Sequence, residues 1–270
     1  MSFRDRLRAA RHKLPWLVEG WLTGPDARDT ALTAVRLARQ GTSVTAGYFS
    51  PHGVAHADIV AAYCQFAEAV GQAGIVACLS IKAPKLDFDP EAMRRIAATG
   101  LPLVFDAHGP DLADATHAAA ANLGAGVVLP ARWRRSLGDA TEWRDRPVRI
   151  RVVKGEWPDP HDDPADRSAA FLALIEKLAG RTAPVGIATH DPALAAPALA
   201  LLKSSGTPCE LELLRGLPRR SCEAIARDAG VPVRLYLPFG GGWWSYAIDS
   251  ALDRPYLPLW WLKDRFSRAS

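Results

Sequence analysis

The stretch PVRIRVVKGEW, residues 147–157, alternates branched apolar residues with Arg149 and Arg151 and then breaks at Gly155. An alternation with a period of two is typical of a β-strand. Both arginines then lie on one face of that strand, and a buried guanidinium without a partner costs too much free energy to be kept. The stretch therefore predicts a strand whose arginines meet either acidic side chains of the same chain or an anionic ligand.

Strand-like apolar runs recur along the rest of the chain, and alanine-rich or leucine-rich amphipathic stretches with a helical period separate them. With residues 148–155, the runs are 43–49, 75–82, 102–107, 125–131, 185–190, 209–214 and 233–238. Eight strands alternating with helices predict an α/β fold, a single closed (β/α)8 barrel of the TIM type. An open doubly wound sheet fits less well, because no GxGxxG motif follows the first strand. We expect residues 1–40 to form an N-terminal helical segment and residues 41–270 to form the barrel.

The composition, 49% hydrophobic and 23% charged residues, is ordinary for a globular protein and allows a large core in 270 residues. No run approaches the roughly 20 apolar residues that span a bilayer, and the basic start lacks an apolar signal core, so we expect a cytoplasmic protein. The net charge of +4 comes with scattered arginines, which does not predict a nucleic-acid partner. The four cysteines and seven histidines show no metal-ligand spacing, so no metal site is expected.

Polar side chains follow the strands of the predicted barrel, at the carboxyl ends where the chemistry of such barrels takes place. They are Ser80, Lys82, Asp106, His108, Arg151, Lys154, Thr189, His190, Glu210, Glu212, Arg234 and Tyr236. Two compatible interpretations stay open at this point. The arginines, Arg149 included, neutralise Glu210 and Glu212 in an ion-pair network inside the barrel, or a ligand binds above them.

These strand ends resemble the motifs of the proline dehydrogenase family, in order, over roughly residues 75–255. SIK (80–82) resembles the family's strand-two lysine motif, FDA (105–107) its IDAE, RVVKGEW (151–157) its RLVKGAYW, IATHD (187–191) its ATHN, ELELLRG (210–216) its EFQxLxG and VRLYLPFG (233–240) its VRVYxPxG. The resemblance implies a flavoprotein of proline metabolism. Its barrel would carry FAD and oxidise L-proline to pyrroline-5-carboxylate, with hydride passing from the carbon beside a secondary amine to flavin N5.

Carried over position by position, the resemblance also implies site residues. Arg151 is similar to the arginine beside the reactive part of the flavin, where a guanidinium stabilises negative charge on the reduced ring. The candidate catalytic residues are Lys82, Asp106, Arg151 and Tyr236. The candidate cofactor-binding residues are Arg151, Lys154, Gly155, Trp157, Thr189 and His190. A quinone or another electron acceptor is an implied partner.

The helix that follows the last strand departs from the family. Its Tyr-x-x-Arg-Arg-x-x-Glu pattern grips the substrate carboxylate, but here the same place reads Tyr246-Ala-Ile-Asp249-Ser250-Ala-Leu-Asp253. Each charged hydrogen bond in such a clamp contributes about 1.5–3 kcal/mol, so we expect free proline to bind badly. Tyr246, Asp249 and Asp253 are the candidate substrate-binding residues, and their charge favours an amine or a proline-like imino compound over an amino acid.

Three further departures concern the cofactor: Pro130 and Glu212 replace family glutamines, and Glu156 replaces a small residue. They favour an alternative, a degenerate barrel without flavin that acts as a binding, regulatory or repurposed protein. A third interpretation is a metal-dependent lyase that uses Asp106, His108, His190 and Glu212. The tail is rich in tryptophan, with GGGWW at 240–244 and RPYLPLWWLKDRF at 254–266. We expect its tryptophans to plug the barrel mouth or to pack the final helix on its neighbours, and the alternative is at most peripheral membrane contact.

Overall fold

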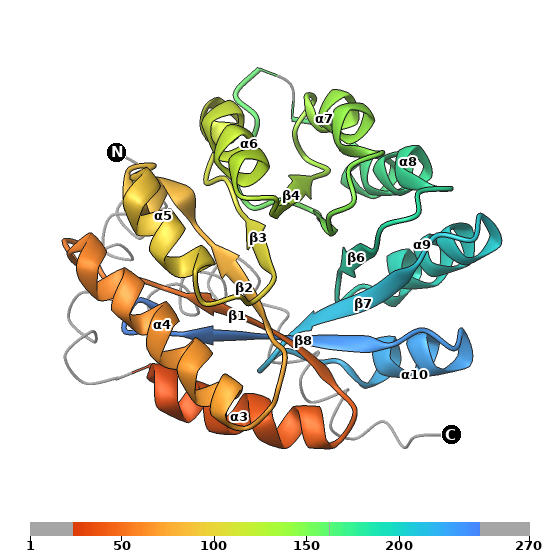
Figure 1. The fold of residues 1–270 in the computed structure, drawn as a ribbon. Helices are drawn as coiled ribbons and strands as arrows, with labels where there is room; N and C mark the ends of the chain where they lie inside the picture. Colours follow the sequence, from red (N-terminus) through yellow and green to blue (C-terminus); the bar gives the residue numbers. More distant parts are fainter. Residues whose placement is uncertain (1–23, 162, 244–270) are drawn as a thin grey trace, which may run out of the picture.

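The computed structural model describes residues 24–161 and 163–243, and its parallel strands β1 to β8 close into a barrel in sequence order (Figure 1). The strands are β1 (Ser43–Tyr48), β2 (Cys78–Ile81), β3 (Leu103–Phe105), β4 (Gly126–Pro130), β5 (Ile150–Val153), β6 (Val185–Ala188), β7 (Cys209–Leu214) and β8 (Val233–Phe239). Each of the eight apolar runs contains one strand. The predicted (β/α)8 barrel is therefore confirmed.

The helices that follow strands β1 to β7 surround the barrel (Figure 1). They are α4 (His56–Gln72), α5 (Pro90–Ala97), α6 (Ala113–Asn122), α7 (Ser136–Trp143), α8 (Arg167–Leu178), α9 (Pro192–Ser204) and α10 (Arg220–Asp228), and the short 3-10 turns η1 (Ala83–Leu86) and η2 (Pro110–Leu112) precede α5 and α6. Their apolar faces and the outward-facing residues of the strands form one continuous core. Within the described part of the chain, no helix is long and apolar enough to span a bilayer.

A further helix, α3 (Ala27–Arg39), precedes β1 and covers the seam at which the barrel closes. The Asp26 side chain caps it by accepting a hydrogen bond from the Asp29 backbone N–H at 2.8 Å. Its buried alanines, Ala27, Ala31 and Ala34, belong to the core, and the helix lies beside α4, β1 and β8. Part of the segment expected to precede the barrel is thus packed into the outer ring.

Strand register directs the charged residues of β5, β7 and β8 into the barrel interior. In the strand register, Arg151 lies opposite Gly186 of β6, Gly186 lies opposite Glu210 of β7, and Glu212 lies opposite Arg234 of β8. Neighbouring strand residues of opposite phase, such as Ile150 and Leu211, lie in the core against the helices. Because side chains alternate between faces of a strand, a shift of register by one residue would bury the charges against the helices.

Two interior glycines make room for large polar side chains from other strands. A Cβ at Gly186 would collide with the guanidinium of Arg149, and a Cβ at Gly47 would collide with the hydroxyl of Tyr236. Glycine is the residue that permits such close approach. The barrel interior is therefore shaped to hold these polar groups, not only branched apolar layers.

Candidate functional site

The lower part of the barrel interior holds an ion-pair network. Arg149 contacts Glu210 and also pairs with Glu212 at 2.6 Å, and Arg234 pairs with Glu210 at 2.9 Å. The Arg234 guanidinium also donates to the Val44 carbonyl at 2.7 Å. Because the Glu210 and Glu212 side chains are only 10% and 2% exposed, each acid needs these partners to remain charged. The expected neutralisation of interior arginines by acids is present.

Arg151 lies above this network and joins it to the barrel mouth. Its guanidinium donates to Glu212 and to Asp106, each at 3.2 Å, and its carbon lies 5.0 Å from the ring centroid of Tyr236. Burial disfavours the charged form, but Glu212 and Asp106 outweigh burial and raise the pKa of Arg151. Arg151 is thus held between Glu212 and Asp106, whereas Arg149 is the arginine between Glu210 and Glu212.

Lys82 brings a positive charge to the mouth, and no acid in the described part of the chain balances it. Its ammonium donates to the Tyr48 carbonyl at 3.1 Å and lies 3.9 Å from the ring centroid of Phe49, and the residue is only 9% exposed. Among residues 24–161 and 163–243, no carboxylate lies within ion-pair distance of it. The Tyr63 hydroxyl fixes this corner by accepting from Tyr48 N–H at 3.1 Å and donating to the Ser80 carbonyl at 2.6 Å.

A second cluster lies around Asp191, at the N-terminus of α9. The Lys154 ammonium pairs with Asp191 at 3.0 Å, and the Asp191 side chain also caps α9 by accepting from Ala193 N–H at 3.1 Å. The Thr189 hydroxyl accepts from the Asp191 N–H at 3.1 Å. Two candidate cofactor residues, Lys154 and Thr189, therefore share Asp191 as a partner. The family motif ATHN has asparagine at the position of this acid.

His190 connects the end of β6 to the loop after β7. Its Nδ1 lies 2.6 Å from the Pro218 carbonyl, and its Nε2 accepts from Leu214 N–H at 2.8 Å. These partners fix a neutral ring with the proton on Nδ1, so both nitrogens are committed to the backbone. No group of three His, Cys, Asp or Glu in the described ranges is arranged to hold a metal ion.

The loop after β5 is fastened to the segment after β4. Gly155 turns the chain with φ +94°, a conformation that favours glycine, and a Cβ there would lie 3.0 Å from carbons of Pro130 and Arg132. The Arg132 guanidinium donates to the Glu156 carbonyl at 2.7 Å and forms two hydrogen bonds with Asp163. Gly155 thus packs closely against the protein's own loop.

Trp157 lies on this loop and covers one face of His108. The two ring centroids are 5.9 Å apart with an interplanar angle of 26°, and the Trp157 carbonyl accepts from the Trp133 indole N–H at 2.9 Å. Burial lowers the pKa of His108 to about 4, Asp106 opposes that shift, and Lys82 adds to it. His108 is therefore neutral at neutral pH.

The structure brings the predicted residues together in two groups. Asp106, Arg151 and Tyr236 are in direct contact at the mouth, and Lys154 and Thr189 meet at Asp191. The ring nitrogens of His190 point to backbone groups, and Trp157 is 51% exposed. Tyr246, Asp249 and Asp253 lie outside the described residues.

Sequence reasoning missed the supports of this mouth. Tyr63 comes from the middle of α4, where nothing in an amphipathic pattern marks its hydroxyl as a bridge between β1 and β2. Phe49, under the Lys82 ammonium, follows β1 directly. His108 was recognised as a strand-end residue without a role in the leading interpretation, although its spacing of two from Asp106 was the available signal.

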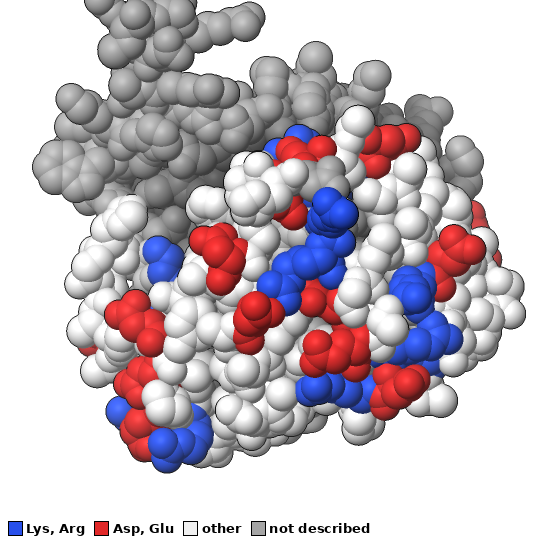
Figure 2. All heavy atoms as spheres, turned by 90° about the horizontal axis from the view of Figure 1, so that it is seen from above, with Lys and Arg blue, Asp and Glu red and all other residues white. Residues whose placement is uncertain are grey.

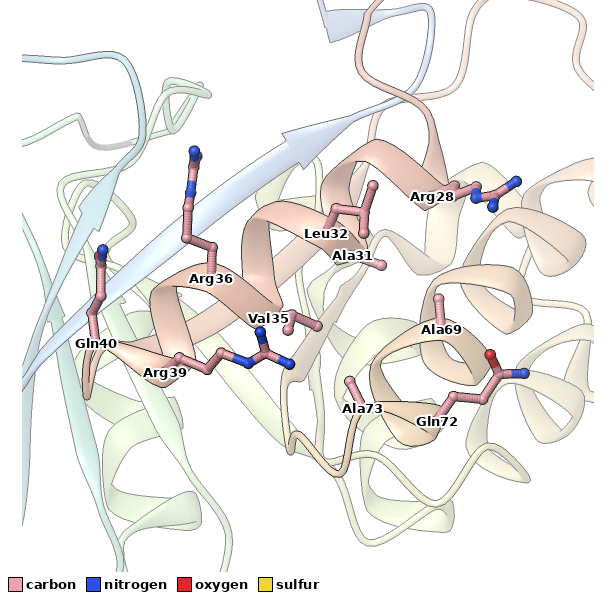
Figure 3. Close-up of a pocket in the computed structure, with 10 residues that line it drawn as sticks. All are labelled: Arg28, Ala31, Leu32, Val35, Arg36, Arg39, Gln40, Ala69, Gln72 and Ala73. Atoms are coloured by element: carbon pink, nitrogen blue, oxygen red, sulfur yellow. The ribbon is translucent and has the colours of Figure 1, made fainter.

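A groove of about 610 Å³ lies between α3 and α4 and is lined by Arg28, Leu32, Arg39 and Ala69, among others (Figure 3). None of the predicted site residues lines it. On the face shown in Figure 2, basic and acidic side chains are interspersed. Neither surface presents the polar groups that converge at the barrel mouth.

Comparison with known proteins was made at two levels, sequence and structure, and no protein-family model matches the chain. The proline dehydrogenase of Deinococcus radiodurans is 28% identical over 137 residues, which cover 48% of this chain and 44% of the relative. Proline dehydrogenase 1 of Bacillus subtilis is 27% identical over 139 residues, 48% of this chain and 45% of the relative. The chain thus spans about half the length of these relatives. The resemblance to proline dehydrogenases seen in the strand-end motifs is confirmed.

Solved structures support the architecture. Proline utilization A (PutA) from Bdellovibrio bacteriovorus, inactivated by N-propargylglycine, superposes with a TM-score of 0.70 and 18% identity over 96% of this chain and 36% of that chain. PutA from Corynebacterium freiburgense has a TM-score of 0.70 and 17% identity over 93% of this chain and 32% of that chain. At these identities the likeness shows a shared fold.

Replacement of Glu212 by glutamine is expected to destabilise the protein strongly. The change leaves Arg149 and Arg151 short of a buried counter-charge, and breaking a buried pair costs about 3 kcal/mol or more. Glu91→Gln is the matched control, because the pair between Glu91 and Arg94 is exposed and contributes about 1 kcal/mol or less. Urea unfolding measures both values. Equal, small losses for the two variants would contradict the network.

Replacement of His108 by glutamine is expected to remove part of the pH dependence of stability. Burial lowers the pKa of His108 from 6.5 to about 4, so the unfolded chain binds more protons than the folded protein between these pH values. The free energy of unfolding of the wild type therefore falls as the pH decreases through this window, and that of His108→Gln falls less. Urea unfolding at several pH values, with His52→Gln as an exposed control, measures the difference. Parallel curves for all three proteins would exclude a shielded imidazole.

Proposed function

We propose that this chain, which resembles the proline dehydrogenases, is an FAD-dependent oxidoreductase that removes hydride from the carbon beside a secondary amine. The supporting observation is the barrel mouth, where Arg151 is held by Asp106 and Glu212 and Lys82 carries a charge that no described acid balances. The proposal includes a cytoplasmic location and a quinone or another acceptor for the electrons.

The residues present fit the ring end of a flavin. Lys82 brings a positive charge that no described acid balances to the carboxyl end of β2, which suits a ring that becomes more negative when it is reduced, and Arg151 presents guanidinium donors at the end of β5. The Nε of Arg151 is buried and makes no hydrogen bond within the described chain, so a donor is left unmet. FAD, when bound, would supply the hydride acceptor. Lys154, Thr189 and the backbone at Gly155 would hold its phosphate side, with His190 and Trp157 beside them.

The chain's own residues would bind and orient the substrate. Arg151 is positioned before any ligand arrives, because Glu212 and Asp106 fix its guanidinium from two sides. The hydroxyl of Tyr236, the carboxylate of Asp106 and the ammonium of Lys82 would shape the substrate side. Asp106 attracts a positively polarised N–H group, which favours an amine. Without the two arginines of the family clamp, L-proline would lose most of its carboxylate binding.

The Lys154–Asp191 pair favours a second candidate function, a barrel that binds a small molecule without flavin. Lys154 would have to exchange Asp191 for a phosphate to hold FAD, and this acid stands where the family motif has a neutral residue. Glu156 adds a further negative charge to the same loop. In this alternative the mouth keeps its polar groups for recognition and has lost its redox role.

The test is cofactor retention followed by reduction. We expect protein incubated with FAD and desalted to stay yellow, and pyrrolidine to bleach the flavin absorbance under anaerobic conditions faster than L-proline does. Arg151→Lys should retain less flavin, because an ammonium replaces a fork-shaped guanidinium only poorly, whereas the exposed control Arg94→Lys should behave like the wild type.

Loss of all FAD on desalting would overturn the proposed function and favour the barrel without flavin. Retained flavin that only L-proline reduces would leave the enzyme class standing and overturn the amine preference.

A further inference from the structure

The imidazole of His108 occupies the mouth without a role in the function proposed above. It follows Asp106 by two residues, beyond the point where the Asp106 N–H continues the β3 ladder by donating to the Ile81 carbonyl at 2.8 Å. Its place after the end of β3, together with the stack on Trp157 of the loop after β5, puts the ring at the rim of the mouth beside Asp106. The IDAE motif of the family has glutamate at this position, so the histidine is a feature of this chain.

The two ring nitrogens of His108 make no hydrogen bond to any of the residues that the structure describes. The ring is partly buried, and its nitrogens are not among the fully buried polar atoms that lack a partner, so they face accessible space. A neutral imidazole carries one donor and one acceptor. Both capacities therefore remain available to a molecule that enters the mouth.

The orientation of the ring is fixed by a supported stack. Trp157 covers one face of His108, and the indole N–H of Trp133 holds the Trp157 carbonyl. Trp133 is itself buried and packs with Ala107, the residue that precedes His108. A ring held in this way keeps one orientation. It therefore loses little rotational freedom when a ligand binds, which favours the affinity for that ligand.

The charges around the ring decide what it would bind. Asp106 gives one carboxylate oxygen to Arg151, and the Asp106 side chain is 24% exposed. Lys82, bound to the Tyr48 carbonyl at the end of β2, is the nearby cation without a described acid partner. An N–H group of a ligand is thus attracted to the side of Asp106 and His108, and an acceptor group is attracted to Lys82.

We propose that His108 is a specificity-determining residue that accepts a hydrogen bond from the amine N–H of the substrate, with Trp157 holding the imidazole in place. The inference rests on the proposed function and deepens it by assigning the amine to the β3 side of the mouth. It requires a ligand with an N–H donor, such as a secondary amine.

The experiment observes the imidazole directly. Protein labelled with ¹⁵N-histidine is titrated with pyrrolidine, and the ring signals of His108 are identified by their absence in His108→Gln. We expect these ring signals to shift with saturation, whereas the signals of the exposed His52 do not move. His108→Ala should weaken pyrrolidine binding about fivefold, as expected for one lost hydrogen bond, and His108→Gln, which retains an acceptor, should lose less.

Steady-state kinetics adds a second readout. For an enzyme that turns over amines, His108→Ala should raise KM about fivefold with little change in kcat, because the contact is made in the bound ground state. The exposed control His52→Ala should leave both constants unchanged.

The outcomes separate the two proposals. Amine binding that shifts the His108 signals without any flavin reduction would support the inference and count against the oxidoreductase function. Flavin reduction by amines that is unaffected in His108→Ala would overturn the inference and leave the function in place. An absence of amine binding by the wild type would overturn the inference outright, whatever its flavin content.

Discussion

The charged state of Arg151 inside the barrel is the constraint on which the rest of the site depends. A guanidinium that is 6% exposed survives only with anionic partners, and it has Glu212 below it and Asp106 above it. The register of β5 to β8 brings Arg151 and Glu212 to one side of the sheet, and Asp106 follows the end of β3. Gly186 leaves the space that Arg149 needs. The floor of the mouth is consequently nearly neutral.

The nearly neutral floor determines which charges the mouth above it offers to a ligand. Acids of the same chain neutralise the interior arginines, so these arginines attract an incoming anion only weakly. Among the residues that the structure describes, Lys82 keeps a charge that no acid balances. His108 is a neutral ring that makes no hydrogen bond to these residues. The described part of the mouth therefore offers a ligand one ammonium without an acid and one imidazole without a hydrogen bond.

The features of the fold that depend on the periodicity of apolar residues could be predicted from the sequence. Alternation in residues 147–157 correctly indicated a strand with two inward arginines, and eight such runs indicated the closed barrel. The alternation did not predict that Arg151 would form ion pairs with Asp106 and Glu212, because these contacts depend on the stagger between strands. It also missed the Lys154–Asp191 pair and the stack of Trp157 on His108, because both join loops whose paths no local pattern encodes. The substrate helix expected at Tyr246 to Asp253 lies outside the described residues.

The most direct test of this account is a double-mutant cycle on the pair at the floor of the mouth, with Asp106→Asn, Arg151→Met and the double variant compared by urea unfolding. If Asp106 holds the buried guanidinium, the two losses will be non-additive, with a coupling energy of about 1 kcal/mol or more. Losses that add within about 0.5 kcal/mol would show that Asp106 and Arg151 are independent, and the account of the mouth would be wrong.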